Sequence, residues 1–239
     1  MIIDNISFSY VDSSPVFENF SLIFEKNRIY SIVGPSGCGK TTLFKILAGV
    51  LQPQKGSVSY EKDENHSIMM QADTLLPWRT VVDNIRLGHE LATGKSVCDT
   101  TIEQCLSDFR LEEIKESFPA ELSAGMKQRV ALIQAMIPEA SYLFLDEPFS
   151  NLDFDVKIHV QQSLLDNHSK TQNTIVIITH DIEDAIALSD EIVVLSAKPA
   201  NVLERIPINK SVSDPAAVRS SPILAEYFQN IWSLLRKSL

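Results

Sequence analysis

A glycine-rich segment that begins at Gly34 constrains this chain more than any other feature. It reads Gly-Pro-Ser-Gly-Cys-Gly-Lys-Thr and fits the spacing G-x-x-x-x-G-K-[ST] at every fixed position. An apolar run, 28–33, precedes it, and a stretch with helical periodicity, 41–50, follows it. In this setting the spacing is typical of a P-loop, whose backbone N–H groups surround phosphate oxygens at a helix N-terminus. The alternative is a glycine-rich turn with an incidental lysine.

The P-loop interpretation predicts a site for Mg-ATP and a role for its residues. Lys40 supplies a full positive charge at the β- and γ-phosphates, and the Thr41 hydroxyl is a hard oxygen ligand for Mg²⁺. Cys38 occupies a variable position of the loop and is not expected to act as a nucleophile. The residues expected to bind ATP here are Gly34, Pro35, Ser36, Gly37, Cys38, Gly39, Lys40, Thr41 and Thr42.

A second motif supplies the acidic groups that accompany a P-loop. The apolar residues 142–145 predict a buried strand, and Asp146 and Glu147 follow it directly. Asp146 is expected to bind Mg²⁺, directly or through water, and Glu147 to act as the general base on the attacking water. A strand that ends in two solvated acids is common by itself. Its pairing with a P-loop favours the catalytic interpretation.

Apolar periodicity predicts an α/β fold with a mostly parallel sheet and helices on both faces. Two antiparallel strands are expected near 3–10 and 20–24, before the P-loop. Further strands are expected at 57–60, 67–70, 142–145, 174–178 and 191–195, and helices at 41–50, 123–136, 153–168 and 182–188. The largely helical stretch 80–136 has breaks near Gly94 and Arg110 and is expected to be an inserted subdomain of a domain spanning 1–210. The tail, 211–239, is expected to be an appendage with a final helix near 223–235.

Charge and cysteine content narrow the classes of function. The chain has 239 residues, 21 Lys and Arg against 31 Asp and Glu, and a net charge of -10. This balance argues against general nucleic-acid binding, which needs clustered positive charge. Three scattered cysteines predict no disulfide framework and a reducing cytosol. Neither a signal peptide nor an apolar run of roughly 20 residues is evident, so any work at a membrane is expected to need a partner.

The segment 122–131, Leu-Ser-Ala-Gly-Met-Lys-Gln-Arg-Val-Ala, resembles the signature motif of ATP-binding cassette (ABC) ATPases, usually L-S-G-G-Q. The order of motifs is also similar to that family's: P-loop, glutamine loop at Gln71, signature, acidic strand, D-loop at 150–153 and a switch histidine at His180. The resemblance covers residues 1 to about 210. It implies a P-loop NTPase fold with an N-terminal antiparallel β subdomain and an inserted α-helical subdomain.

Several site residues are implied only by this resemblance. Gln71 is expected to contact Mg²⁺ and the attacking water, and His180 the γ-phosphate. Ser123 and Gly125 of the signature, with Asp153 of the D-loop, are expected to complete the ATP site of a second copy of the chain, so that two ATP molecules are enclosed in a homodimer.

Three positions of this pattern leave alternatives open. Tyr10 matches the aromatic residue that stacks on adenine, although a tyrosine within the sheet is nearly as good an interpretation. Ala124 and Met126 depart from the usual signature. An alanine is acceptable at position 124 only if its φ angle is negative, as in the first turn of a helix.

The loop that follows Gln71 indicates a partner. Leu75, Leu76 and Trp78 form an apolar group that could pack locally or meet another protein. The run Leu-Leu-Pro-Trp resembles ATPases of the nitrate, sulfonate and taurine importers and of relatives that import thiamine-precursor pyrimidines. The resemblance implies contact with an integral membrane permease near these residues.

The same resemblance implies a location and an activity. We expect a peripheral ATPase at the cytoplasmic face of the bacterial inner membrane, coupled to solute uptake and fed indirectly by an extracytoplasmic substrate-binding protein. The alternative is a soluble cassette protein that is not coupled to transport. A small-molecule kinase with the same P-loop is a third class, against which the ordered signature, D-loop and switch histidine argue.

Overall fold

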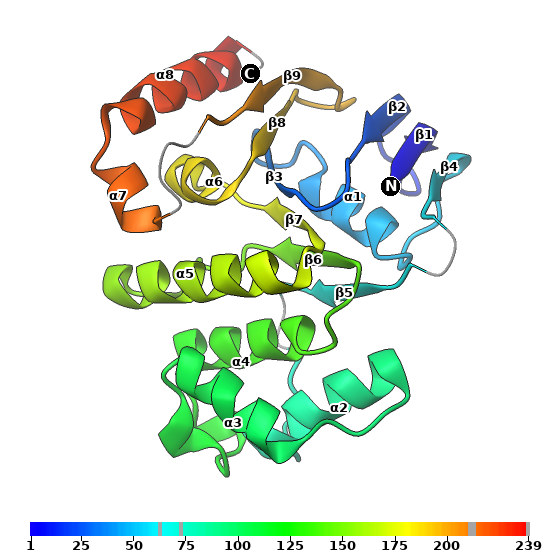
Figure 1. Ribbon diagram of the computed structural model, residues 1–239. Helices are drawn as coiled ribbons and strands as arrows, with labels where there is room; N and C mark the ends of the chain where they lie inside the picture. The colour runs from blue at the N-terminus through cyan, green and yellow to red at the C-terminus, as the bar shows by residue number, and fades with distance from the viewer. Residues whose placement is uncertain (62–63, 72–73, 210–213, 238–239) are drawn as a thin grey trace.

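The computed structural model describes residues 1–61, 64–71, 74–209 and 214–237 (Figure 1). Its strands are β1 (Ile2–Phe8), β2 (Phe17–Ile23), β3 (Ile29–Val33), β4 (Lys55–Ser59), β5 (His66–Met69), β6 (Tyr142–Asp146), β7 (Thr174–Ile178), β8 (Glu191–Leu195) and β9 (Val202–Pro207). Its α-helices are α1 (Lys40–Leu47), α2 (Val81–Thr93), α3 (Asp99–Asp108), α4 (Ala124–Met136), α5 (Phe154–Thr171), α6 (Ile182–Leu188), α7 (Pro215–Arg219) and α8 (Pro222–Lys237). Two short 3-10 helices, η1 (Glu112–Ile114) and η2 (Pro119–Glu121), lie between α3 and α4.

The central sheet has the strand order β5-β6-β7-β3-β8-β9. Each neighbouring pair among β5, β6, β7, β3 and β8 is parallel, and β9 pairs antiparallel to β8. Strands β3, β6, β7 and β8 are buried at every residue, because a parallel sheet covered on both faces exposes neither side of its strands. The α/β expectation is therefore confirmed. The edge strand β9 was not expected from the sequence.

Alternate residues of β6 divide the core into two layers. Leu143 and Leu145 join a cluster with residues of α4 and α5, such as Val160. Phe144 points to the opposite face and joins α1 residues such as Phe44 and the N-terminal strands. The period of two in a strand produces this division. Figure 1 shows α1 on one side of the sheet and α5 and α6 on the other.

The N-terminal strands form a separate antiparallel sheet of order β2-β1-β4. One face of each half-buried strand contributes to the core, for example through Ile6 and Phe20, which are 0% and 1% exposed. This sheet packs in the same cluster as α1. The predicted antiparallel pair at the start of the chain is present, with the third strand starting at Lys55.

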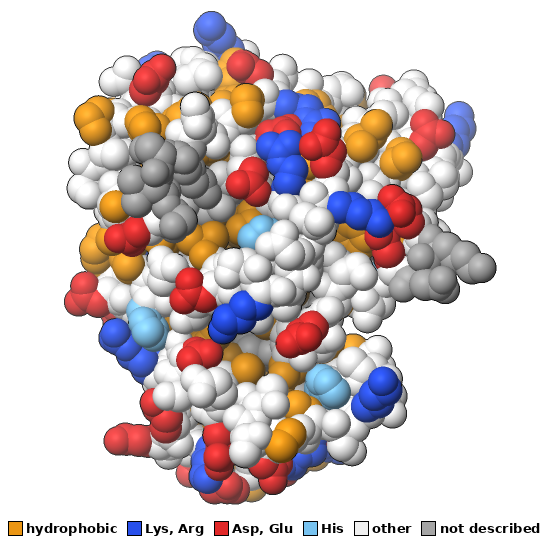
Figure 2. Space-filling model, viewed as in Figure 1, with side chains coloured by type: hydrophobic (Ala, Val, Ile, Leu, Met, Phe, Trp, Pro, Cys, Tyr) orange, Lys and Arg blue, Asp and Glu red, His pale blue; other side chains and the backbone are white. Residues whose placement is uncertain are grey.

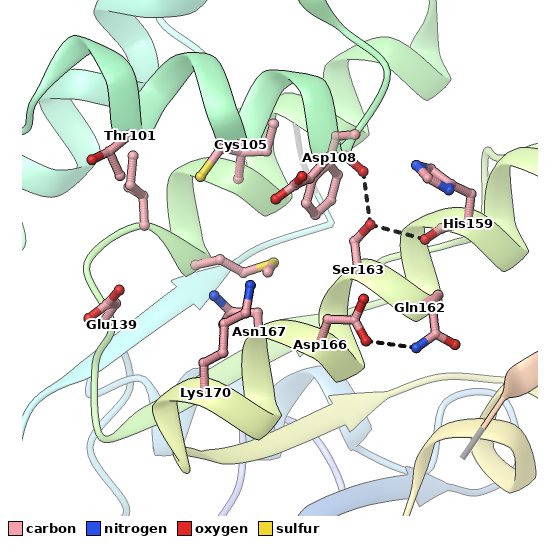
Figure 3. Close-up of a pocket in the computed structure, with 14 residues that line it drawn as sticks. Thr101, Cys105, Asp108, Glu139, His159, Gln162, Ser163, Asp166, Asn167 and Lys170 are labelled. Carbon is pink, nitrogen blue, oxygen red and sulfur yellow. Dashed lines mark hydrogen bonds between the residues drawn. The ribbon is translucent and has the colours of Figure 1, made fainter. Parts of the chain in front are cut away.

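Helices α2, α3 and α4 lie together at the end of the molecule remote from β9 (Figure 1). Gly94 and Arg110 interrupt the helical stretch as expected, with φ angles of 68° and 54°. A crevice of ≈ 250 Å³ separates α3 from α5 (Figure 3), and Ser163 Oγ crosses it by donating to the Asp108 carbonyl at 2.8 Å. Cys105 faces this crevice.

Helices α7 and α8 pack on α6 at the other end of the chain (Figure 1). Ile231 of α8 is fully buried, in one cluster with Ile186 of α6 and Ile206 of β9. The final helix was expected, whereas the five-residue α7 was not. The expected boundary between 210 and 211 lies outside the described residues. None of the helices among the described residues combines the length and apolar composition that crossing a bilayer requires.

Candidate active site

Three neighbouring parallel strands end at the same edge of the central sheet. Ile178 of β7 pairs with Asp146 of β6 on one side and with Ile32 of β3 on the other. The residues that follow these strands therefore converge, as expected for a ligand site at the carboxyl ends of an α/β sheet. They surround a hollow of ≈ 610 Å³ lined by Gly34, Ser36, Gly37, Gly39, Lys40, Thr41, Thr42, Gln71, Asp146, Glu147, Ile178, His180 and Lys198.

The glycine-rich loop connects β3 to α1 along one wall of this hollow. Gly39 has a φ angle of 120°, and a Cβ atom there would lie 2.5 Å from Val16 Cγ1, so only glycine fits. Lys40 Nζ donates to the Gly34 carbonyl at 2.8 Å and to the Pro35 carbonyl at 3.1 Å. These bonds hold the ammonium group over the loop, where an anionic group on the backbone N–H donors would meet it.

Asp146 forms the acidic part of the hollow. It is 3% exposed, and burial, followed by the Glu147 carboxylate, raises its pKa to about 6. Its Oδ1 atom is buried and has no hydrogen-bond partner among the described residues. A buried carboxylate oxygen without a donor, in a hollow that Thr41 also lines, suits a hard divalent cation such as Mg²⁺.

Glu147 adopts an uncommon backbone conformation immediately after β6. Its φ angle of 53° lies in the left-handed region, which a non-glycine residue seldom occupies without a functional or packing reason. The backbone N–H of Glu147 donates to the Ile178 carbonyl at 2.8 Å, which fixes the turn. His180 Nδ1 donates to Glu147 Oε1 at 2.7 Å, and Thr179 Oγ1 lies 3.4 Å from Oε2. The carboxylate is thus oriented on both of its oxygens.

Gln71 follows β5 and lies at the junction of two hollows. It lines the site described above. It also lines a smaller hollow of ≈ 160 Å³, together with Ala124 and Gln128 of α4 and Asn151. The glutamine loop, the start of the signature helix and the D-loop therefore meet at this residue.

Tyr10 lies next to the hollow of ≈ 610 Å³ and is not among its lining residues. Its hydroxyl is 3.2 Å from Thr42 Oγ1, and its ring packs edge-on against Phe8 with centroids 5.0 Å apart. The side chain is 44% exposed, so part of the ring is available to a ligand. Stacking on adenine stays a prediction.

Among the described residues, five others that are expected to bind ATP do not line the hollow: two belong to the P-loop, and three are expected to serve the ATP site of a second copy of the chain. Pro35 contributes its carbonyl to Lys40, and Cys38 is 2% exposed behind the loop. The remaining three are Ser123, Gly125 and Asp153. A single copy of the chain does not bring them to the P-loop.

The signature segment begins helix α4 as expected. Ser123 is the N-cap and its hydroxyl accepts from the Met126 N–H at 3.2 Å. Ala124 is the first helical residue and its φ angle is not positive, so an alanine there causes no backbone strain. Met126 packs against the core cluster of α4 and α5. Both departures from the usual motif are therefore compatible with the fold.

Two residues of this region were missed by the sequence reasoning. Gln128 donates from Nε2 to the Glu147 carbonyl at 2.6 Å and accepts at Oε1 from the Asn151 N–H at 2.9 Å. It therefore ties the signature helix to both ends of the segment that follows β6. Lys198 lines the hollow from the loop after β8. The signal for Gln128 was its place on the signature helix, whereas no local pattern marks Lys198.

The apolar side chains of the loop 74–80 differ in their exposure. Leu75 is 8% exposed and belongs to the core cluster of α4 and α5, which agrees with the alternative of local packing for this residue. The fully buried Asn84 holds the loop by accepting from the Leu76 N–H at 2.7 Å and donating to its carbonyl at 3.2 Å. Trp78 is 71% exposed and is the prominent apolar side chain of the loop.

Comparisons with known proteins agree with this geometry. The family model described as ABC transporter matches residues 17–150. YtlC of Bacillus subtilis (strain 168), named as an uncharacterized ABC transporter ATP-binding protein, is 36% identical over 243 residues, covering 95% of this chain and 91% of the relative. The taurine import ATP-binding protein TauB of Escherichia coli O157:H7 is 37% identical over 213 residues, covering 85% and 84%.

A solved structure shares the fold. The dimeric post-hydrolysis state of the ATP-binding cassette MJ0796, bound to ADP and Pi, superimposes with a TM-score of 0.77 at 22% identity, covering 88% of this chain and 100% of that chain. The chain therefore belongs to the ABC transporter family, as one of its ATP-binding subunits, whose ATP hydrolysis is coupled to transport.

Proposed function

We propose that this chain is the ATP-hydrolysing subunit of an importer, and that two copies close around two Mg-ATP to drive uptake of a small solute of the sulfonate or taurine type. The observation that carries the proposal is the convergence of Lys40, Asp146, Glu147 and His180 on one hollow at the carboxyl ends of β3, β6 and β7. This set contains a phosphate-binding cation, a buried acid and an oriented general base.

The loop and Lys40 bind the phosphates of ATP. Residues at the start of α1 line the hollow, and no side-chain hydrogen bond from the described residues caps this helix. The backbone N–H groups of a helix N-terminus favour an anion. Thr41 and Asp146 would hold Mg²⁺, with Gln71 as a further oxygen ligand. When bound, Mg²⁺ neutralises charge that develops on the phosphate oxygens.

Glu147 acts on the water that attacks the γ-phosphate. His180 and Thr179 direct its two carboxylate oxygens, and the left-handed turn after β6 sets the direction of the side chain. A base held in this way abstracts or orients the proton of the attacking water as the bond to phosphorus forms. His180 is 73% exposed, which leaves its ring available to the γ-phosphate.

Two copies of the chain are needed for a complete site. Ser123 and Gly125 lie at the start of α4, outside the hollow of their own copy, and Ser123 is exposed. Asp153 begins α5 and is also exposed. In the proposed dimer these residues meet the γ-phosphate bound to the other copy, where the N-terminus of α4 adds favourable N–H groups.

Trp78 and the half-buried Leu76 are the proposed contact with permease subunits. A large exposed aromatic side chain on a loop that Asn84 holds rigid is suited to a protein interface. On the face drawn in Figure 2, the Lys and Arg side chains of the described residues lie among Asp and Glu. This distribution and the net charge of -10 favour a protein partner over nucleic acid.

The location and the solute follow from the importer proposal. The chain would work at the cytoplasmic face of the bacterial inner membrane, held there by the permease and supplied through an extracytoplasmic substrate-binding protein. The name of the taurine import relative TauB supports a sulfonate-type solute. Nitrate and thiamine-precursor pyrimidines stay predictions from the sequence.

A pull-down from detergent-solubilised native membranes tests the proposal, with this chain as bait and mass spectrometry of the recovered proteins. We expect a polytopic permease, and we expect Trp78→Ala to reduce its recovery while leaving ATP hydrolysis by the isolated chain intact. Trp232→Ala is the matched control, since Trp232 is 51% exposed on α8. Recovery of soluble proteins alone would favour a cassette protein that is not coupled to transport. Uptake of labelled taurine by proteoliposomes containing the recovered complex then tests the solute.

A further inference from the structure

Three acidic residues follow His180 at the start of α6, and two of them, the N-cap Asp181 and the buried Asp184, pair with cations from other helices. Asp181 Oδ1 caps the helix by accepting from the backbone N–H groups of Glu183, at 2.9 Å, and Asp184, at 3.1 Å. The backbone N–H of Asp181 in turn donates to Thr179 Oγ1 at 3.0 Å. The backbone on both sides of His180 is therefore held by hydrogen bonds, and this matters because the His180 side chain itself is 73% exposed.

Two cations from other helices face these carboxylates. Lys157 of α5 donates to Asp181 Oδ2 at 3.0 Å and to Asp184 Oδ2 at 3.1 Å. Arg219 of α7 donates from Nη2 to Asp184 Oδ1 at 2.6 Å, and these two side chains are only 8% and 4% exposed. Gln161 Nε2 also donates to Asp184 Oδ1, at 2.9 Å. Two carboxylates are thus balanced by two cations.

We propose that Arg219 is a positioning residue for His180. By pairing with Asp184 it leaves Lys157 free to hold Asp181, and the Asp181 cap fixes the backbone that presents His180 to ATP. The inference rests on the proposed function, because it requires His180 at the reacting phosphate. Through this ion pair the C-terminal helices take part in ATP hydrolysis.

The charge balance explains why Arg219 matters at a distance. Burial, and then the Asp181 carboxylate, raise the pKa of Asp184. Without Arg219, two neighbouring carboxylates share Lys157 alone, and a buried carboxylate without a counter-charge is strongly unfavourable. Lys157 Nζ already lies within hydrogen-bond distance of both, so it shifts towards the more buried Asp184. Asp181 then loses its Oδ2 partner, and the cap next to His180 loosens.

Arg219 is itself held firmly by the C-terminal segment. Its Nη1 donates to the Pro215 carbonyl at 3.2 Å, and Asp214 caps α7 by accepting from the Ala216 N–H at 2.9 Å. Helix α8 follows and buries Ile231 against α6. Figure 1 shows α7 and α8 beside α6, so the arginine reaches Asp184 from a packed element.

Steady-state ATP hydrolysis by the full chain and its variants tests the proposal, with kcat expressed per nucleotide-binding site counted by ATP titration. We expect Arg219→Gln to lower kcat by about tenfold or more while KM for ATP changes little, because displacement of a catalytic group acts on the reacting state. Arg219→Lys keeps the charge and should retain most of kcat. Arg236→Gln, the same change at an exposed arginine of α8, is the matched control and should behave as the parent.

A second-site change gives a readout that loss of folding cannot imitate. Asp184→Asn removes the carboxylate that Arg219 compensates, so Lys157 stays with Asp181. We therefore expect the double variant Asp184→Asn, Arg219→Gln to recover most of the kcat lost in Arg219→Gln. If Arg219→Gln does not fold, the double variant is compared with Asp184→Asn alone, and equal kcat values support the charge-balance role.

Two results overturn the inference. One is a kcat per binding site that Arg219→Gln leaves at the parent value. The other is a loss in the double variant as large as that in the single one. Failure of the proposed function looks different: the parent chain then lacks ATP hydrolysis, or His180→Ala leaves it unchanged. If the parent hydrolyses ATP, and substitution of His180 but not of Arg219 lowers kcat, only the proposed role of Arg219 is refuted.

Discussion

The Glu147 carboxylate and the His180 ring lie side by side at the ends of adjacent strands, with Glu147 Oε1 2.7 Å from His180 Nδ1. The residues are 33 positions apart in sequence, and the parallel register of β6 and β7 brings them together. The left-handed backbone of Glu147 turns its side chain towards the hollow that contains Lys40 and Asp146. The proposed base and the histidine that contacts it thus adjoin the P-loop.

Glu147→Gln should abolish turnover while leaving ATP binding intact. The carboxamide has nearly the same shape and can still accept from His180, but it cannot take up a proton. Loss of a general base typically lowers the rate by about 10²-fold to 10⁴-fold. Phosphate release measures the rate, and light scattering after chromatography should detect an ATP-bound dimer. Glu204→Gln, at an exposed position of β9, is the control. Hydrolysis at the parent rate would show that Glu147 is not the base.

Asp146→Asn should stabilise the metal-free protein at neutral pH and remove Mg-dependent hydrolysis. Because burial raises the folded-state pKa of Asp146 from 3.8 to about 6, the folded protein binds this proton more tightly than the unfolded chain does. The parent therefore loses stability as pH rises from about 4 to about 6, and the asparagine variant escapes this loss.

Thermal unfolding in EDTA between pH 4 and pH 8 measures this effect. The difference in Tm between Asp146→Asn and the parent should be near zero at the acid end, grow through pH 5 and level off above pH 6. Asp12→Asn, in an exposed turn, should show no such trend. A lower Tm for Asp146→Asn at pH 8 would contradict the burial of an uncompensated carboxylate.

Gly125→Ala should separate the signature helix from the D-loop. A Cβ atom at this position would lie 2.8 Å from the Asn151 carbonyl oxygen and 3.4 Å from Leu152 Cδ2. Since the nearest atom belongs to the backbone, one of the two segments must move, and overpacking of this kind costs about 1–3 kcal/mol. Urea unfolding measures the change. The reciprocal substitution Ala124→Gly meets no such contact and should cost at most about 1 kcal/mol. If the two substitutions lowered the free energy of unfolding equally, the close approach of Gly125 to the Asn151 carbonyl would be refuted.

The three thiols should react in a defined order. Cys98 is exposed, and its hydrogen bond with Thr100 lowers its pKa. Burial, and then Asp108 and Glu139, raise the pKa of Cys105 in the crevice of Figure 3 to about 11. Burial also raises the pKa of Cys38. Because the thiolate is the nucleophile, iodoacetamide at pH 7 should modify Cys98 first.

Peptide mass spectrometry over pH 7–9 follows each site. The rate at Cys105 should climb about tenfold per pH unit, since this range lies below its pKa. The rate at Cys98 should reach its plateau at a lower pH than the rate at Cys105, because the pKa of Cys98 is lowered. In denaturant the three cysteines should react at similar rates. Faster modification of Cys105 than of Cys98 in the folded protein would contradict the described burial.

Sequence patterns predicted the motifs whose chemistry is local. The P-loop, the acidic strand and the Ser123 cap each depend on neighbours a few residues away, so their spacing is visible in the chain. Strand β9 was not predicted, because its polar residues, such as Glu204 and Arg205, and its terminal Pro207 are only a weak sequence signal of an edge strand. Helix α7 has five residues, too few for a helical period to be seen.

By itself, the sequence determined the order of the phosphate-binding, acidic and switch motifs and the α/β class, since both follow from short-range residue types and apolar periods. The tertiary structure decided which of these residues meet. It brought Glu147 to His180, placed Gln128 between Glu147 and Asn151, and withdrew Leu75 into the core. Such contacts depend on strand order and on the packing of helices far apart in the chain, which no local spacing encodes.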